Sequence, residues 1–268
     1  MAKYKLTPKL GSAVNLQQYD PDYHDGLDEK DVADEVVKLK EKLETLQEKL
    51  YAESKQALLV VLQAMDTGGK DGAIKKVFEG VNPQGVDVTS FKAPTPEELA
   101  HDFLWRVHRF TPAHGYIGVF NRSYYEDVLI VRVNNLVPKS VWKTRYETIN
   151  QFEELLTTNR TRVLKFYFHI SKEEQKQRLM SRIANPKKQW KFKMEDLPVR
   201  EQWDDYMVAY EAMLERCNTD YAPWHIIPAN HKWYRDLIVL RTIVATLEDM
   251  NPKYPKPEDG LDKVVIPD

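Results

Sequence analysis

Apolar residues return at three- and four-residue steps after Asp31, and lysines and glutamates fill the positions between them. The apolar positions of this stretch are Val32, Val36, Leu39, Leu43, Leu46 and Leu50. Such spacing puts them on one face of an amphipathic α-helix. We expect this face to be buried against the chain's own domain. A contact between subunits is the alternative use of the same face.

Short runs of aliphatic, β-branched and aromatic residues recur along the rest of the chain. These runs lie at 57–63, 86–91, 116–120, 163–170 and 224–227. Stretches with helical spacing separate them, at 73–78, 97–110, 124–133, 139–156 and 233–250. Ser171 is the predicted N-cap of one further helix, because Glu173 and Glu174 follow it where carboxylates favour the helix dipole. Strands that alternate with helices predict an α/β fold with a parallel sheet covered on both faces.

The length and composition of the chain suit one sizeable domain. Of the 268 residues, 42% are hydrophobic and 11% are aromatic, which argues against disorder outside the two ends. Residues 1–26 are rich in Pro, Gly, Tyr and Asp and show no period, so we interpret them as an N-terminal arm. We expect a single domain over 27–250 and an irregular C-terminal tail over 251–268.

Charge and cysteine content exclude several classes of protein. The 39 basic and 41 acidic residues give a formal net charge of −2, which does not support a globally basic nucleic-acid binder. Cys217 is the only cysteine, so an intramolecular disulfide and a cysteine-rich metal site are excluded, and a reducing, cytoplasmic location is favoured. We expect neither a signal peptide nor a membrane span, because no apolar run is long enough.

A glycine-rich segment lies between the first predicted strand and the helix after it. It reads Ala64-Met65-Asp66-Thr67-Gly68-Gly69-Lys70-Asp71-Gly72. Backbone N–H groups at a helix start attract anions, and glycines allow close approach and positive φ. We interpret the segment as a phosphate-binding loop, with the ammonium group of Lys70 as its point charge. The other residues expected to contact phosphate are Thr67, Gly68, Gly69, Asp71 and Gly72.

The loop departs from the pattern GxxxxGK[ST] at two positions. Ala64 stands where the first glycine belongs, and Asp71 replaces the hydroxyl that helps to hold Mg²⁺. We expect Asp66 to substitute, either as a hard oxygen ligand of the metal or as a group that activates the acceptor. A glycine-rich turn followed by an exposed lysine is the alternative, which the order of strand, loop and helix disfavours.

Several separated motifs agree with one known family. They are AMDTGGKDG, FKAPTPEE, FLWRVH, FNRSYYEDV and a basic segment after them, in this order between roughly residues 30 and 250. The chain resembles the polyphosphate kinase 2 family, and its class III branch most closely. This resemblance implies a P-loop kinase fold similar to that of thymidylate kinases, a three-layer α/β/α sandwich with a helical lid. It also implies transfer of a terminal phosphate from inorganic polyphosphate to AMP and ADP, with Mg²⁺ or Mn²⁺ as cofactor.

The resemblance assigns roles to individual residues. Asp66 and Lys70 match the family's loop aspartate and lysine, which serve metal and phosphate. Arg122 falls in the second motif at the end of the third predicted strand, where its planar fork suits bidentate phosphate binding. Arg106, in the FLWRVH motif, is expected to hold the acceptor phosphate, and an ordinary charge at a helix end is the alternative.

Position 121 departs from the family pattern, because many relatives carry Asp where this chain has Asn121. Two neighbouring carboxylates, Glu126 and Asp127, are the alternatives for its role, and the sequence does not decide between them. We include Asp127 among the catalytic residues, with Asp66, Lys70 and Arg122. Asn121 together with Glu126 resembles the branch that accepts nucleoside monophosphates, so these two residues are expected to select the acceptor.

A second source of positive charge lies after the fourth predicted strand. Arg178 and Arg182 are four residues apart and hence on one helical face. Lys187 and Lys188 follow in a segment without acidic residues. We interpret about 178–200 as a lid whose arginines meet the transferred charge and whose lysines guide the polymer. A solvated basic loop is one alternative, and a surface that stacks single-stranded nucleic acid is another.

Three functions are weighed on these grounds. The leading hypothesis is a polyphosphate-dependent kinase of adenine nucleotides, with no nucleic-acid or membrane partner. An ATP-dependent nucleoside monophosphate kinase is second, because such kinases usually keep Ser or Thr where Asp71 stands. A non-catalytic polyanion-binding module is third, since carboxylates at 66, 126 and 127 favour metal chemistry. The resemblance suggests a homodimer or homotetramer.

Overall fold

The computed structural model describes residues 5–261 and 264–267. Its centre is a sheet of five parallel strands in the order β2-β3-β1-β4-β5. The strands are β1 (Ala57–Ala64), β2 (Val86–Ser90), β3 (Ile117–Asn121), β4 (Thr161–His169) and β5 (Trp224–Pro228). All five lie within two residues of the predicted runs. Parallel pairing follows from the helices that connect successive strands.

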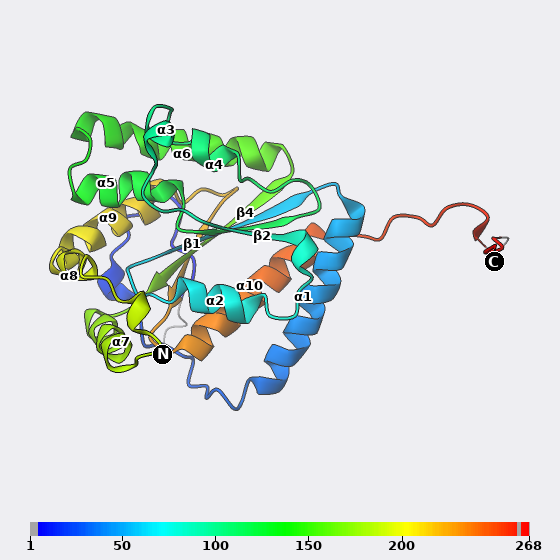
Figure 1. Cartoon of the computed structure of the whole chain (residues 1–268), viewed down its shortest axis with the longest axis horizontal. Coiled ribbons are helices and arrows are strands. Elements are labelled where there is room, and N and C mark those ends of the chain that lie inside the picture. Colours follow the sequence, from blue (N-terminus) through cyan, green and yellow to red (C-terminus); the bar gives the residue numbers. More distant parts are fainter. Residues whose placement is uncertain (1–4, 262–263, 268) are drawn as a thin grey trace.

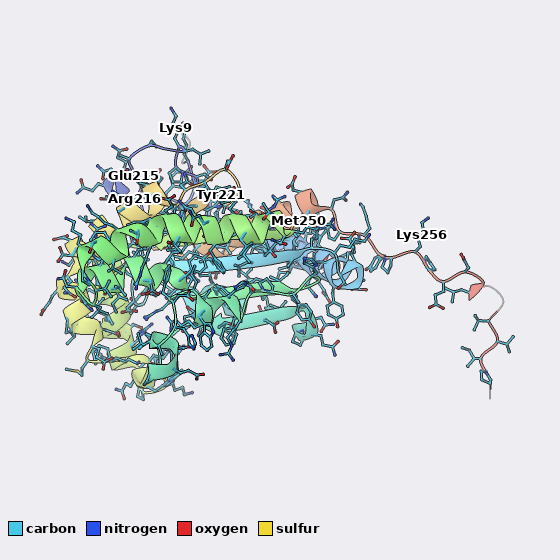
Figure 2. All side chains as sticks on the ribbon, turned by 90° about the horizontal axis from the view of Figure 1, so that it is seen from above. Lys9, Glu215, Arg216, Tyr221, Met250 and Lys256 are labelled. Atoms are coloured by element: carbon cyan, nitrogen blue, oxygen red, sulfur yellow. The ribbon has the colours of Figure 1, made fainter. Side chains whose placement is uncertain are left out.

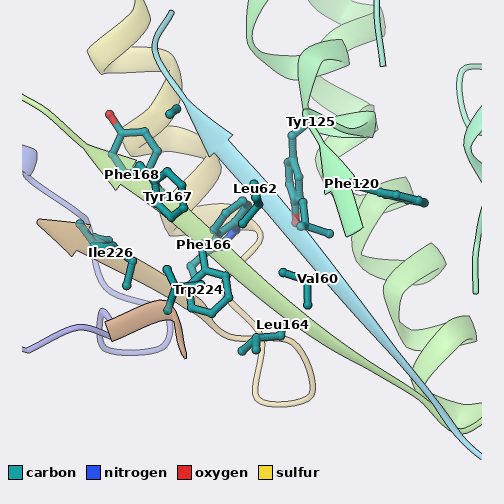
Figure 3. Close-up of a cluster of buried hydrophobic side chains, with 14 of the residues drawn as sticks. Val60, Leu62, Phe120, Tyr125, Leu164, Phe166, Tyr167, Phe168, Trp224 and Ile226 are labelled. Carbon is teal, nitrogen blue, oxygen red and sulfur yellow. The ribbon is translucent and has the colours of Figure 1, made fainter. Parts of the chain in front are cut away.

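The two central strands form the middle of the hydrophobic core. Every residue of β1 is buried, and β4 exposes only Arg162. Val60 of β1 is in register with Val119 of β3 and Leu164 of β4. Aromatic side chains from β3, β4 and β5 fill the space around these strands (Figure 3). Strands buried on both faces read as continuous apolar runs, which is why the sequence predicted them.

Helices cover both faces of the sheet, so the predicted three-layer α/β/α architecture is confirmed. Helices α1, α2 and α10 pack on one face, and α5, α6 and α9 on the other (Figure 1). The α-helices are α1 (Ala33–Glu53), α2 (Lys70–Val77), α3 (Pro96–Leu99), α4 (Trp105–His108), α5 (Ile130–Val133), α6 (Lys139–Thr158), α7 (Lys172–Ala184), α8 (Asp196–Glu201), α9 (Trp203–Arg216) and α10 (Lys232–Met250). Four 3₁₀ segments among the described residues are η1 (Leu16–Gln18), η2 (Pro83–Gly85), η3 (Tyr124–Val128) and η4 (Gln189–Lys191).

Two predicted helices are wrong as continuous elements. The stretch 97–110 contains α3 and α4, because Asp102 between them accepts from the N–H groups of Leu104 and Trp105 and starts a new turn. The stretch 124–133 divides into η3 and α5 at Leu129, whose φ of −105° and ψ of −90° are not helical. Helix α9 was not predicted.

The amphipathic helix α1 packs against its own domain, as expected. Leu43 and Leu50 are fully buried, and α10 is the main partner of the helix. Arg241 of α10 also binds Glu35 through two hydrogen bonds of 2.6 Å. A bidentate pair of this kind fixes the register between the two helices.

The two ends of the chain differ in how they contact the domain. The described part of the arm, residues 5–26, runs along the domain, and its Leu16 is buried in the core. At the outer edge of the sheet, Ile226 of β5 donates to the Leu6 carbonyl at 2.7 Å. The tail instead keeps contact through buried Pro252 and through Tyr254, whose ring lies 5.7 Å from the Lys49 ammonium, and then leaves the domain past Lys256 (Figure 2). None of the described helices combines the length and the apolar character needed to cross a membrane.

A buried ion pair ties four elements together inside the core. The Lys165 ammonium group of β4 donates to Glu153 at 2.6 Å, to the Tyr125 hydroxyl at 2.9 Å and to the Cys217 carbonyl at 2.6 Å. The hydroxyls of Tyr124 and Tyr125 each donate to Glu153 at 2.7 Å. Lys165 and Glu153 are fully buried. The network therefore holds η3 against β4 and α6 through satisfied polar groups.

We predict that Lys165→Met lowers the free energy of unfolding by about 3–5 kcal/mol, because it leaves the Glu153 carboxylate buried without a cation. Urea denaturation measures this loss. The double variant Lys165→Met/Glu153→Gln removes the uncompensated charge and should recover part of the stability. A loss below about 1 kcal/mol in the single variant would contradict the interpretation.

His169, at the end of β4, gives a second prediction. Burial lowers the pKa of His169 to about 4, although the backbone of Tyr19 and Leu16 in the arm opposes the shift. The unfolded chain binds the proton more readily, with a pKa near 6.5. The contribution of neutral His169 to stability is therefore complete above about pH 6.5 and lost as the pH falls toward 4. Between these pH values, the free energy of unfolding of His169→Phe should depend less steeply on pH than that of the parent. Equal slopes in the two proteins would refute this prediction.

Candidate functional site

The phosphate loop leaves β1 at Ala64 and enters α2 at Lys70. Two of its residues have positive φ, Thr67 at 63° and Gly69 at 98°. The Gly68 N–H donates to the Met65 carbonyl at 2.9 Å and closes a tight turn. A β-branched residue such as Thr67 rarely adopts this backbone conformation, which shows that surrounding contacts determine the shape of the loop.

The glycines of the loop have different roles. A Cβ at Gly68 would lie 2.5 Å from the Ala64 Cβ, so no side chain fits there. Gly69 has the positive φ, and a Cβ on it would collide with the Arg235 guanidinium. The expectation of positive φ is wrong for Gly68 and Gly72, and an added Cβ at Gly72 would make only an ordinary contact. The phosphate contact of Gly72 stays a prediction.

Lys70 is buried at the first position of α2. Its ammonium group curls back onto the loop and donates to the Ala64 carbonyl at 2.8 Å and the Met65 carbonyl at 3.4 Å. Burial lowers the pKa of Lys70 to about 8; Arg122 acts in the same direction, and the carboxylates Asp66 and Glu126 oppose it. The group is directed into the site and not toward bulk solvent.

Arg122 faces the loop from the end of β3. Its guanidinium donates to Asp66 at 2.6 Å. Burial acts to lower the pKa of Arg122, but Glu126 and Asp66 outweigh it, and the net shift is upward. The φ of Arg122 is 62°, and its N–H donates to the Leu62 carbonyl of β1 at 3.1 Å. This conformation carries the residue over the carboxyl ends of the central strands, where open α/β sheets bind ligands.

Asn121 and Asp71, which are both departures from the expected motifs, contact each other. The Asn121 amide donates to the Asp71 carboxylate at 2.6 Å. This bond joins the end of β3 to the first turn of α2, where an acidic side chain is favourable.

The two alternative carboxylates point to different surroundings. Burial raises the pKa of Glu126, and the opposing charges of Arg122 and Lys70 do not cancel the rise. Glu126 therefore belongs with Asp66, Lys70 and Arg122 to one group of charges, the loop cluster. Asp127 instead pairs with Arg145 of α6 at 2.8 Å. Burial raises the pKa of Asp127 to about 6, against the influence of Arg145. The charges that act on Glu126, and the pairing of Asp127 with Arg145, favour Glu126 as the second carboxylate of the site.

Arg106 is buried on α4 and contacts residues of the segment that precedes this helix. It donates to the Lys92 carbonyl at 2.8 Å and lies 3.5 Å from a Glu98 oxygen. Its charge also acts on Asp127. These contacts hold the segment between β2 and α4, and its contact with an acceptor phosphate stays a prediction.

The predicted basic lid, about 178–200, covers the second half of α7, all of η4 and α8 up to Arg200. Lys187 and Lys188 are exposed, whereas Arg182 donates to the Lys191 carbonyl at 3.2 Å and lies 3.9 Å from Asp196. Arg178 is buried and donates to the Thr67 carbonyl of the phosphate loop at 3.1 Å. Lys187 and Lys188 are therefore accessible to solvent, whereas Arg178 and Arg182 are bound by protein oxygens.

Three residues beside the loop are not predicted as site residues by the sequence analysis. Gln175 is fully buried and donates to the Asp66 carbonyl at 3.1 Å. Arg235 packs against Gly69 and binds Asp236 through two nitrogens, at 2.8 and 2.6 Å. Tyr210 of α9 is buried near Glu126, which helps to raise its pKa, although burial is the larger cause. Of these three, only Arg235 could be noticed in the sequence, because it is a charged residue within the apolar pattern of α10.

The site is defined by oxygen and nitrogen groups of the loop and the strand ends. Within the described ranges, no group of three or more His, Cys, Asp or Glu side chains is arranged to enclose a metal ion. Three carboxylates nonetheless act on Lys70, since the charges of Asp66, Glu126 and Asp71 each raise its pKa. Fold and site together define a parallel α/β protein with a glycine-rich loop between its first strand and the next helix, an arrangement that favours anions.

Comparison with known proteins identifies the family. The polyphosphate kinase 2 model matches residues 26–255, and the chain belongs to this family. It is 50% identical over 268 residues to an AMP/ADP-polyphosphate phosphotransferase of Meiothermus ruber, covering 99% of this chain and 100% of the relative. It is 48% identical to an ADP-polyphosphate phosphotransferase of Rhodopseudomonas palustris, covering 81% and 79% of the two chains.

A solved structure agrees with this assignment. The crystal structure of polyphosphate kinase 2 from Arthrobacter aurescens TC1 superposes with a TM-score of 0.92 at 42% identity. The match covers 96% of this chain and 93% of that one. The family resemblance seen in the sequence motifs is confirmed.

We predict that Glu126→Gln lowers kcat/KM for polyphosphate-driven nucleotide phosphorylation by about 100-fold or more, since it removes a charge from the loop cluster. Asp127→Asn, the matched change at the adjacent residue, should lower it less than about 10-fold, because its carboxylate serves Arg145. Steady-state kinetics of both variants measure the difference. The reverse order would show that Asp127 is the second carboxylate.

Proposed function

We propose that the chain is a polyphosphate-dependent nucleotide kinase, which transfers a terminal phosphate from inorganic polyphosphate to AMP and ADP. The observation that carries this proposal is the buried Lys70 ammonium at the start of α2, with Arg122 and three carboxylates around it. Both acceptors are supported by a relative named for AMP and ADP that matches 99% of this chain, and ADP also by a second relative that matches 81% of it.

The protein's part in phosphoryl transfer is positioning and neutralisation of charge. Backbone N–H groups of the loop and the Lys70 ammonium would hold the transferred phosphate. Arg122 would bind a second phosphate oxygen from the end of β3, with Asp66 orienting its guanidinium at 2.6 Å. Because Lys70 is buried, its charge acts through a medium of low polarity and is weakly screened.

A divalent cation fits the carboxylates of the loop cluster. Asp66 and Glu126 both act on Lys70 and Arg122, so their charges face the same region. Mg²⁺ is commonly held by one or two carboxylates together with substrate phosphates, and Mn²⁺ accepts the same oxygen ligands. When bound, the metal would neutralise charge on the phosphate oxygens.

We assign the exposed lysines of the predicted lid, Lys187 and Lys188, to the polymer beyond the transferred phosphate. They are accessible, and no acidic residue lies in the sequence between them and Lys193. Arg182 would act beside them. The cytoplasmic location and the homodimer or homotetramer stay predictions.

A direct assay tests the proposal. Protein, Mg²⁺, long-chain polyphosphate and AMP should yield ADP and then ATP, and EDTA should abolish the reaction until Mg²⁺ is added back. Lys70→Met keeps the length of the side chain but removes its charge, so we expect a loss of about 100-fold or more in kcat. Lys75→Met, at an exposed position of the same helix, is the matched control and should remain active.

Two results would replace this function with another. Product from ATP and AMP, with none from polyphosphate, would indicate an ordinary nucleoside monophosphate kinase. Polyphosphate binding without turnover under these conditions would indicate a non-catalytic polyanion-binding module.

A further inference from the structure

Helix α7 holds the backbone of the phosphate loop from outside. Gln175 donates to the Asp66 carbonyl and Arg178 to the Thr67 carbonyl, both at 3.1 Å. Thr67 is the loop residue with a φ of 63°, and its hydroxyl is buried without a hydrogen-bond partner among the described residues. The Thr67 hydroxyl therefore contributes no hydrogen bond to this conformation, whereas the Thr67 carbonyl is held by Arg178.

The same guanidinium also binds the turn between β5 and α10. Its Nη2 donates to the Ala229 carbonyl at 2.6 Å and the Asn230 carbonyl at 3.1 Å, and its Nε donates to Glu174 at 2.6 Å. All three nitrogens of Arg178 therefore have acceptors within the protein. Arg178 is 8% exposed. These bonds use four of the five N–H groups of the guanidinium, so the protein itself fixes the position of Arg178.

Asn230 connects this turn to the N-terminal arm. Its N–H donates to the Pro21 carbonyl at 3.0 Å, and its side-chain amide donates to Asp22 at 3.2 Å. Its side-chain oxygen accepts from the Ser171 N–H at 3.0 Å, at the N-cap of α7. One asparagine thus contacts the arm, the start of α7 and, through its own carbonyl, Arg178.

We propose that Asp22, Asn230 and Arg178 form a chain of positioning residues that sets the conformation of the phosphate loop. The N-terminal arm is then part of the catalytic apparatus, although it lies outside the loop and strand ends. Arg178 acts through the Thr67 carbonyl and not as a ligand of phosphate. This proposal rests on the proposed function for its kinetic readout, and a second readout is independent of activity.

Asn230→Asp is the central variant, because it keeps the oxygen that accepts from Ser171. It loses the donor to Asp22 and places two carboxylates together. We expect kcat to fall about 10-fold, with KM for polyphosphate changed less than about 3-fold. Hydrogen exchange of the backbone amides of residues 65–70 should become faster, while exchange in the central strands stays unchanged.

The charge-swapped pair Asp22→Asn/Asn230→Asp restores a donor opposite a carboxylate and should recover both kcat and the slow exchange. Asn135→Asp adds the same charge at an exposed loop and is the matched control, with no expected effect. Arg178→Lys keeps a cation but cannot reach three acceptors at once, so it should resemble Asn230→Asp. Combining the two should cost no more than Arg178→Lys alone, because both act on the same contact.

The outcomes separate the alternatives. A raised KM for polyphosphate in Arg178→Lys, with kcat and loop exchange unchanged, would make Arg178 a phosphate ligand and overturn the proposal. Unchanged loop exchange in Asn230→Asp would overturn it as well. If the parent protein shows no polyphosphate-driven turnover, the proposed function fails, and the exchange data still decide whether the arm controls the loop.

Discussion

The site depends on the burial of one ammonium group. Lys70 donates to the Ala64 carbonyl at 2.8 Å, so the loop closes around its own cation. Burying a charge without full compensation is costly, and the pKa of Lys70 accordingly falls to about 8 despite three nearby carboxylates. Burial is the larger cause of this fall, so the charge of Lys70 acts in a medium that screens it weakly. Together with the N–H groups at the start of α2, it forms an arrangement that favours anions.

The remaining cations divide into two groups by their partners. Arg122 and Arg178 already bind protein oxygens, at Asp66 and at the Thr67 carbonyl respectively. Their positions are therefore set before any ligand binds. For Arg122 this fixes a charge beside Asp66 at the end of β3, and for Arg178 it fixes the carbonyl of Thr67 from behind the loop. Exposed lysines such as Lys188 lie at the surface of the predicted lid, where a charged polymer could reach them.

Much of the fold could be predicted because its signals are local. Buried parallel strands read as continuous apolar runs, and the glycine-rich loop stands between a strand and a helix. The contacts of Arg178 could not be predicted, since its acceptors Thr67 and Ala229 lie 111 and 51 positions away. The sequence also could not decide whether Glu126 or Asp127 is the second carboxylate of the site. These adjacent residues of η3 have different surroundings, and Arg145, 18 positions from Asp127, separates their roles.

Asp71 and Asn121 show how two departures from a pattern become one feature. A carboxylate at position 71 replaces the hydroxyl that usually follows the loop lysine, and it needs a donor. The Asn121 amide provides one at 2.6 Å, whereas a second carboxylate at position 121 would repel the first unless a proton or a cation lay between them. The amide thus gives Asp71 a donor within the protein, and the proposed metal ligands are the other two carboxylates, Glu126 and the Arg122-bound Asp66. The departure at position 71 and the departure at position 121 thus account for each other through one hydrogen bond, which neither position reveals alone.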